Sequence, residues 1–416
     1  MSNLVFQKFF DILRNRPQRL LKKDFYLRIN RILHSAFIFS HQKAGALPRL
    51  YFDLSVYSIY DNKTGVQRVI RSIYKEIFPI LSGKYEIVPV SCTAFTKGFQ
   101  VLKENDNGKF LLSGFSISPK EGDVFLSLEQ AFVEHISQRK VFKSMKNKGC
   151  RIILTVYDLL PLQLPQCFPK EIGGIFQKWL VYSSDYAEYI CDSQTVESDL
   201  VNYLSKNGLK EARTYWFYPG SEFAKTISTK KITEEETNYL KILKNFKFNF
   251  LMVGTIEPRK GHKVIFELFT KLWSAGEKVS LTFIGKEGWM VEDFATFLKN
   301  AKEKNVNFFW FNKASDEFLD LCYKETDAVI IASLNEGYGL PILEAAEHNC
   351  RIIANDIPVF REVGPEGCYF IDFAETEVAH MQLRNWINKP SKKCKRPSSH
   401  TWRNSTLQIL KRTKIM

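Results

Sequence analysis

The chain has 416 residues, which is too long for one ordinary domain and suits two domains with extensions. Apolar residues make up 45% and charged residues 25% of the chain, which is typical of a folded protein and excludes a disordered one. The formal net charge of +14 favours an anionic partner such as nucleic acid, a membrane surface or a phosphorylated small molecule. We expect no nucleic-acid partner, because the sequence has no RRM, KH or helix-turn-helix signature.

Cysteine and histidine spacing indicates neither a disulfide framework nor a metal site. The eight cysteines are far apart, and several lie in apolar runs. We therefore expect buried free thiols in a reducing compartment. The seven histidines show no spacing of the His-Glu-x-x-His kind, so we expect no metal and no cofactor.

Residues 1–48 form a basic, aromatic extension whose only acidic residues are Asp11 and Asp24. The apolar residues are interrupted by Lys and Arg, which is unlike a signal peptide, and no stretch of the chain approaches the roughly eighteen apolar residues of a membrane span. We therefore expect a cytoplasmic protein. The extension can lie on the anionic inner face of the cell membrane or pack on the protein's own flank, and the sequence leaves both open.

From residue 49 the pattern alternates between strands and helices. The segment "RLYFDLS" predicts a buried strand, and "TGVQRVIRSIYKEIF" predicts an amphipathic helix that begins at a Thr-Gly turn. Further β-rich runs follow, separated by helical stretches: "KYEIVPV", "GDVFLSL", "CRIILTVYDLLP" and "YAEYICDS". This alternation indicates a parallel sheet with helices on both faces. A hairpin around Asn107-Gly108 interrupts it.

A polar passage over residues 224–245 separates a second series from the first. Its strands read "FNFLMVG", "VSLTFIG", "VNFFWF", "DAVIIAS", "CRIIAND" and "GCYFID", and its helices are expected to begin near His262, Trp289, Ser315, Leu340 and Val359. The predicted fold class is α/β, with two Rossmann-like, doubly wound domains. We expect the domains over 49–225 and 226–378, and over 379–416 a basic segment whose helix returns to the first domain.

The strongest motif is "ASLNEGYGLPILEAAEHN", residues 332–349. It follows a buried strand, and ligands bind at the carboxyl edge of such sheets. Glycines 337 and 339 allow the backbone to approach a ligand, and Pro341 suits the start of a helix whose N–H groups favour a diphosphate. Glu336 precedes that helix and Glu344 lies about one turn inside it. One carboxylate can accept hydrogen bonds from sugar hydroxyls and the other from a ribose.

The spacing of Glu336 and Glu344 resembles the E-x7-E motif of retaining glycosyltransferases with the GT-B fold, in the family 4 group that includes bacterial mannosyltransferases of polysaccharide synthesis. The segments "VGTIEPRKGH" and "FIGKEGW" also resemble that family. The resemblance implies that Arg259 and Lys260 neutralise the departing pyrophosphate. It further places the donor beside a set of residues comprising Gly254, Lys286, Gly337, Tyr338, Gly339 and Leu340. Many members have Arg where this chain has Thr255, and Lys286 also fits a surface lysine.

Three segments of the first domain resemble the family's cleft segments. Gly65 resembles the glycine of the loop after the first strand, where Arg68 adds charge for a phosphate or an acceptor; a helix cap by Thr64 is the alternative. Relatives frequently have His-Asp where this chain has Tyr157-Asp158, and the tyrosine hydroxyl can donate to the sugar. In "CDSQTV" a helix cap by Ser193 or Thr195 is the favoured reading.

The resemblance implies transfer of a sugar, with mannose favoured, from a nucleotide-sugar donor to a lipid-linked or growing saccharide, with retention at the anomeric carbon. Two alternatives remain: a non-catalytic sugar-nucleotide or polysaccharide-binding protein, and a nucleotide-sugar epimerase on the same fold. An epimerase converts its donor without an acceptor.

Overall fold

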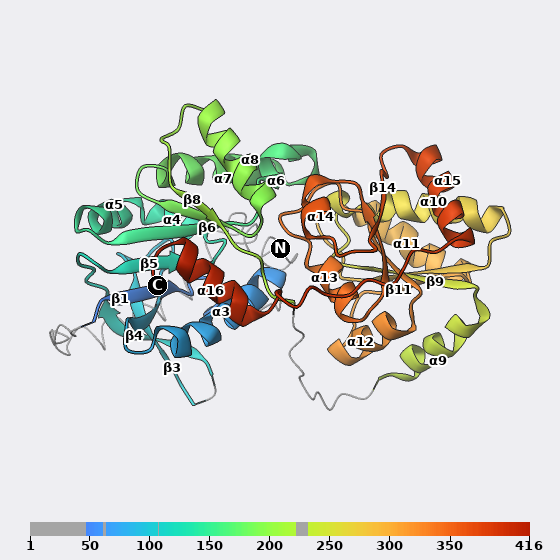
Figure 1. Ribbon diagram of the computed structural model, residues 1–416, viewed down its shortest axis with the longest axis horizontal. Helices are drawn as coiled ribbons and strands as arrows, with labels where there is room; N and C mark the ends of the chain where they lie inside the picture. The colour runs from blue at the N-terminus through green and yellow to red at the C-terminus, as the bar shows by residue number, and fades with distance from the viewer. Residues whose placement is uncertain (1–46, 61–63, 107, 222–231) are drawn as a thin grey trace, which may run out of the picture.

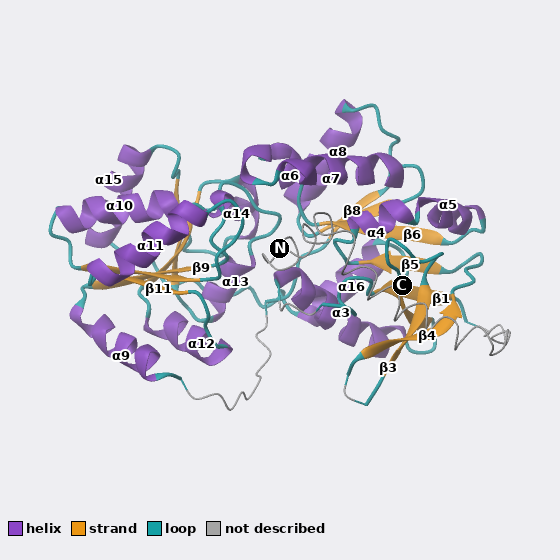
Figure 2. Ribbon diagram, turned by 180° about the vertical axis from the view of Figure 1, so that it is seen from behind, coloured by secondary structure: helices purple, strands orange, loops and turns teal. Residues whose placement is uncertain are grey.

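The computed structural model describes residues 47–60, 64–106, 108–221 and 232–416. They form two α/β domains that lie side by side, each built on one sheet with helices on both faces (Figures 1 and 2). The predicted fold class is confirmed. The extension predicted for residues 1–48 lies almost entirely outside the described residues, as does the boundary predicted between residues 225 and 226.

The first sheet has eight strands, in the order β4-β3-β2-β1-β5-β6-β7-β8. All pairs are parallel except β2–β3 and β3–β4, so the hairpin predicted in this region stands at one edge. Strand β8 was not predicted, because three residues are too short to show a pattern. The strands are β1 (Arg49–Asp53), β2 (Glu86–Ser91), β3 (Gln100–Glu104), β4 (Phe110–Ser116), β5 (Val124–Ser127), β6 (Arg151–Val156), β7 (Glu188–Cys191) and β8 (Thr214–Trp216).

Helices cover both faces of the first sheet. The described helices of this domain are α3 (Gly65–Leu81), α4 (Phe132–Ser137), α5 (Arg139–Asn147), α6 (Leu160–Gln163), α7 (Lys170–Ser183) and α8 (Gln194–Lys206). Helix α3 packs with the last helix of the chain, α16 (Trp402–Arg412), on one face, and helices α5, α7 and α8 pack on the other. Because both faces are covered, side chains from successive strand positions enter different cores: Leu154 lies with one helix layer and Ile153 with the other.

The second sheet has six strands, all parallel, in the order β11-β10-β9-β12-β13-β14. The order reverses between β9 and β12, which makes this the topological switch point where open parallel sheets bind ligands. The strands are β9 (Phe248–Val253), β10 (Val279–Ile284), β11 (Phe308–Phe311), β12 (Ala328–Ile331), β13 (Arg351–Asn355) and β14 (Tyr369–Ile371). Every strand predicted for this domain is confirmed.

Helices again form two layers, one on each side of the second sheet (Figure 2). Helix α11 begins at Glu292, three residues after Trp289, near which its start was predicted, and Trp289 itself packs against the first domain. One layer contains α10 (His262–Ser274), α11 (Glu292–Lys304) and α15 (Thr376–Asn388); the other contains α9 (Glu234–Ile242), α12 (Asp316–Glu325), α13 (Leu340–Glu347) and α14 (Pro358–Val363).

The boundary predicted between residues 378 and 379 is wrong. It falls inside α15, whose Ala379, Leu383 and Trp386 are buried in the core of the second domain. The basic residues around the helix obscured its apolar face. The chain returns only after α15, and α16 then packs against α3 and β8 of the first domain, as predicted (Figure 1).

All eight cysteines are free thiols, and all except the half-buried Cys368 are buried, which confirms their predicted burial. Among the helices that the structure describes, none combines the length and the apolar character needed to cross a bilayer.

Candidate active site

A cavity of about 700 Å³ lies between the two domains, where the carboxyl ends of both sheets meet. Both domains contribute to its walls. Every residue that the sequence assigned to the site lines it: Gly65, Arg68, Tyr157, Asp158, Gly254, Arg259, Lys260, Lys286, Glu336, Gly337, Tyr338, Gly339, Leu340 and Glu344.

Glu336 is the centre of a charged cluster in this cavity. Its Oε2 lies 3.0 Å from Nη1 of Arg259, its Oε1 pairs with Nζ of Lys260, and Ser333 Oγ donates to the same Oε1 at 2.7 Å. Burial raises the pKa of Glu336, but Lys260 and Arg259 outweigh burial and lower it to about 2. Glu336 is therefore an anion at neutral pH.

A short 3-10 turn, Pro258–Lys260, holds the two cations beside Glu336. The turn follows β9 and the glutamate loop follows the adjacent strand β12, so the sheet brings together residues that are 76 and 77 positions apart. Gly261 ends the turn with φ 77°, and a Cβ there would come within 2.3 Å of the Ala332 carbonyl oxygen. The close packing of this turn on β12 therefore requires glycine.

Arg259 also forms an ion pair with a residue of its own segment. Its Nε lies 3.1 Å from Oε2 of the buried Glu257. The sequence analysis did not select Glu257, although it stands in the "EPRKG" segment. Two carboxylates thus fix one guanidinium in the cavity wall.

The two glycines of the glutamate loop meet different neighbours. A Cβ at Gly337 would come within 1.7 Å of the carbonyl oxygen of Tyr157 in the first domain. Gly339 caps α13 with φ 91°, and a Cβ there would come within 2.6 Å of the Phe360 ring. The first glycine lets the domains touch, and the second lets α13 begin with its N–H groups at the cavity.

Glu344 lies one turn inside α13 and pairs with Arg68 of α3. Tyr323 Oη donates to its second oxygen at 3.0 Å. Helix α3 begins as the alternative reading expected, with Thr64 in a capping box, and the adjacent Gly65 also lies at the cavity. The cap and the site role are therefore compatible.

Tyr157 and Asp158 line the cavity at the end of β6, but both have partners within the first domain. The Tyr157 hydroxyl donates to the Leu128 carbonyl at 2.9 Å, and the Leu160 N–H donates to Asp158 Oδ1 at 3.2 Å. The Tyr157 hydroxyl thus donates its proton within the first domain, and its hydrogen bond to a sugar stays a prediction. Its backbone instead forms the contact surface for Gly337.

Ser193 caps α8, as predicted, by accepting from Val196 N–H at 3.1 Å. It also donates to the Gly337 carbonyl at 2.7 Å, which ties the glutamate loop to the first domain. Thr195 is not the cap; together with the backbone N–H of Gln194 it donates to the carboxylate of Glu362 on α14. A second-domain carboxylate thus occupies the N-terminal end of α8.

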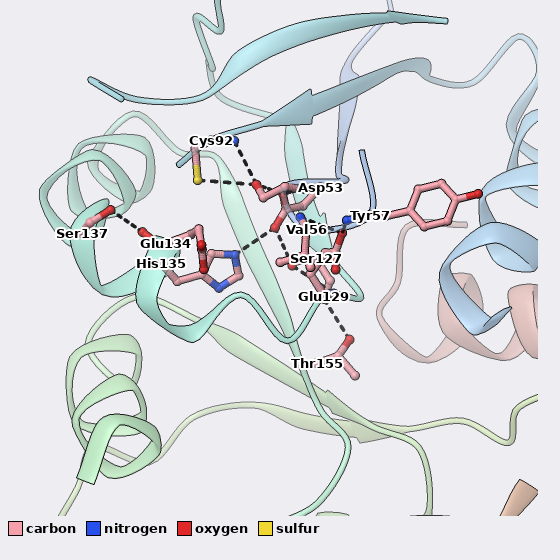
Figure 3. A network of polar contacts seen from close by, with 11 residues as sticks. Asp53, Val56, Tyr57, Cys92, Ser127, Glu129, Glu134, His135, Ser137 and Thr155 are labelled. Atoms are coloured by element: carbon pink, nitrogen blue, oxygen red, sulfur yellow. Dashed lines mark hydrogen bonds and ion pairs between the residues drawn. The ribbon is translucent and has the colours of Figure 1, made fainter. Parts of the chain in front are cut away.

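A buried polar network lies beneath the loop that leads from β1 toward α3 (Figure 3). Asp53 accepts from Ser127 Oγ at 2.7 Å, and His135 Nε2 lies 2.8 Å from the same oxygen. Glu129 accepts from the backbone N–H groups of Val56 and Tyr57. Burial, and then the Asp53 carboxylate, raise the pKa of Glu129 well above its ordinary value. The network fixes the start of the segment that leads to α3, the helix on which Gly65 and Arg68 lie.

The cavity is also lined by residues that the sequence analysis did not select, among them Gln130, Asp192 and Trp289. Trp289 Nε1 donates to the Cys167 carbonyl of the first domain at 2.8 Å. Within the described ranges, no group of three or more His, Cys, Asp or Glu side chains has the geometry to hold a metal ion.

Known structures define the class of fold. HepE of Anabaena in complex with UDP and glucose matches with a TM-score of 0.53 at 13% identity, over 88% of this chain and 95% of HepE. The α,α-trehalose 6-phosphate synthase of Burkholderia multivorans matches with a TM-score of 0.57 at 9% identity, over 89% of this chain and 93% of the synthase. The fold is therefore GT-B, two Rossmann-like domains that face each other.

Sequence comparison shows which proteins the chain is similar to. Residues 236–401 match the model of glycosyl transferases group 1. The serotype-specific mannosyltransferase WbdA of Escherichia coli is 30% identical over 391 residues, 88% of this chain and 45% of WbdA. The O-antigen chain mannosyltransferase RfbU of Salmonella typhimurium is 24% identical over 221 residues, 53% of this chain and 56% of RfbU. The chain spans about half the length of these relatives and carries a group 1 glycosyltransferase domain, which confirms the resemblance.

Proposed function

We propose that this chain is a retaining glycosyltransferase. It moves a sugar, with mannose favoured, from a nucleotide-sugar donor to a saccharide acceptor in bacterial surface polysaccharide synthesis. The observation that carries the proposal is the cluster of Glu336, Arg259 and Lys260 at the N-terminal end of α13, inside the interdomain cavity. The mannosyltransferase names of WbdA and RfbU support mannose as the sugar.

The cluster can stabilise the charge that develops on a leaving nucleoside diphosphate. Arg259, Lys260 and the N–H groups of α13 supply positive charge at one place. Glu336 accepts hydrogen bonds from hydroxyls of the transferred sugar, and Glu344 accepts from the ribose. The leaving phosphate then helps to deprotonate the acceptor hydroxyl on the same face of the sugar, which gives retention. Because fixed cations supply this charge, we expect transfer without a metal ion.

The acceptor is a lipid-linked or growing saccharide, and the enzyme works on the cytoplasmic face of the membrane. The net charge of +14 supports contact with anionic lipid and with a lipid-diphosphate acceptor. Co-sedimentation with vesicles of phosphatidylglycerol and phosphatidylethanolamine tests this part. Equal recovery with and without anionic lipid contradicts it.

Release of nucleoside diphosphate from GDP-, UDP- and dTDP-sugars, with and without a lipid-linked saccharide extract, tests the reaction. The comparison includes Lys260→Ala and, as a matched control, Lys263→Ala, whose side chain is exposed on the next helix. Acceptor-dependent release that is lost in Lys260→Ala and kept in Lys263→Ala supports the proposal. Donor binding without release points to a binding protein, and donor conversion without acceptor points to an epimerase.

A further inference from the structure

Asp192 is a buried carboxylate in the wall of the cavity that neither the motif nor the proposed mechanism uses. It follows β7 directly and precedes Ser193, the cap of α8. The residue is 5% exposed, and its Oδ1 has no hydrogen-bond partner. A buried carboxylate oxygen without a donor is costly, so this position is set up for a group that arrives from outside the protein.

The strongest electrostatic influences on Asp192 are acidic. They come from the carboxylates of Asp158, Glu336 and Glu362. Two cations of the cavity wall, Arg259 and Lys260, pair with Glu336. Burial, and then Asp158, raise the pKa of Asp192 well above its ordinary value. The neighbouring carboxylates would repel a phosphate at this position, whereas a neutral hydroxyl would find a hydrogen-bond partner in Oδ1 of Asp192.

Asp192 also lies close to the loop that carries Glu336. Asp192 and Asp158 follow the paired strands β7 and β6, and both line the cavity. A Cβ at Gly337 would lie 3.1 Å from Asp192 Oδ2, so the carboxylate borders the residue next to Glu336. Acidic groups of the first domain thus face the glutamate loop of the second.

We propose that Asp192, with Asp158 beside it, forms a hydroxyl-binding subsite for a hexose ring at the contact between the two domains. The proposal rests on the proposed glycosyltransferase function, and it adds a residue that selects the sugar. Two sources supply the same chemistry: the sugar of the donor and the terminal sugar of the acceptor. The experiment separates them.

The test compares wild type, Asp192→Asn and the matched control Asp106→Asn, whose carboxylate is exposed in the first-domain hairpin. Asparagine keeps the shape of the side chain and removes one acceptor oxygen. Titration calorimetry measures the affinity for each nucleotide-sugar and for its free nucleoside diphosphate, and kinetics measures the acceptor KM. Circular dichroism checks that each variant is folded.

Weaker binding of the nucleotide-sugar by about tenfold, with unchanged binding of the free diphosphate, assigns the subsite to the donor sugar. An acceptor KM raised by about tenfold, with donor affinity unchanged, assigns it to the acceptor. Values for Asp192→Asn within twofold of wild type in all three measurements overturn the proposal. Binding of a divalent cation to wild type but not to Asp192→Asn also overturns the proposal.

A failure of the proposed function is distinguishable from a failure of this inference. Saturation-transfer NMR with methyl mannoside and methyl glucoside reports hexose binding whether or not any donor is turned over. If wild type releases no diphosphate but binds a hexoside that Asp192→Asn does not bind, the subsite stands and the transferase proposal falls. If no hexoside binds wild type and no donor is used, both fall.

Discussion

Arg68 of the first domain and Glu344 of the second form an ion pair across the cavity, with Nη1 and Oε1 2.8 Å apart. The pair joins helix α3 to helix α13, and both helices begin at the cavity wall. The Arg68 side chain is 27% exposed and that of Glu344 is 6% exposed. This pair connects the second glutamate of the motif to the charged residue predicted for the first-domain loop.

The asymmetric burial of this pair predicts unequal effects of removing each partner. Arg68→Met leaves the Glu344 carboxylate buried with Tyr323 as its remaining donor, so we expect a loss of about 2–3 kcal/mol in unfolding free energy. Glu344→Gln leaves an arginine that can reach solvent, so we expect a smaller loss. Urea denaturation of the two single variants and the double variant measures the difference. Losses that simply add in the double variant contradict the coupling.

The ion pairs of Glu336 predict a pH-dependent stability. Its pKa is lowered from 4.5 to about 2 because Lys260 and Arg259 outweigh the opposing effect of burial. The ionised carboxylate of Glu336 therefore stabilises the folded protein by on the order of 3 kcal/mol. This contribution is complete at pH values above the pKa that Glu336 has in the unfolded chain. It is lost as the pH falls toward the lower pKa that Glu336 has in the folded protein.

The variant Glu336→Gln has no carboxylate at this position, so its unfolding free energy lacks this contribution at every pH. We therefore expect the difference in unfolding free energy between wild type and Glu336→Gln to narrow as the pH falls from about 5 to about 3. Urea titrations at each pH measure it. A difference that stays constant with pH shows that the charge of Glu336 does not contribute in this way.

Gly337→Ala is predicted to disrupt the contact between the domains. The new Cβ would lie 1.7 Å from the Tyr157 carbonyl oxygen, so the glutamate loop must move away from the first domain. We expect a fall in transfer rate of about a hundredfold or more, because a shift of the reacting groups by about an ångström has that effect. Gly174→Ala on α7 is the control, since its Cβ would meet nothing within 4 Å. Equal rates for the two variants would refute the prediction.

Trp402→Ala is predicted to destabilise the first domain. Trp402 begins α16 and is 7% exposed against the core of that domain. Its loss removes a buried aromatic side chain, for which we expect about 3 kcal/mol or more. The neighbouring Arg403, 63% exposed, provides the control Arg403→Ala. Thermal unfolding followed by circular dichroism should show a lower midpoint for Trp402→Ala alone.

Local patterns were sufficient to predict the elements of the second domain. Its strands are buried on both faces and therefore read as continuous apolar runs, and the ends of those runs placed Glu336 and Lys260 at one sheet edge. The glycines of the loop were identified because they stand between that strand and the helix that begins at Leu340.

Sequence patterns did not predict two elements correctly: a helix next to a basic stretch and a very short strand. A basic stretch over residues 389–396 follows helix α15, so the core residues Leu383 and Trp386 of the helix were assigned to a basic tail. Strand β8 has only three residues, which is too few for a period to show.

The sequence by itself therefore determined the two-domain α/β fold and the residues at the edge of each sheet. Only the tertiary structure decided how those edges face each other. Ser193 and Gly337 are 144 positions apart, and Arg68 and Glu344 lie on different domains. Such contacts depend on how two independently folded sheets pack together, and no local spacing encodes that packing. For the same reason Asp192 became visible as a site residue only in the folded protein.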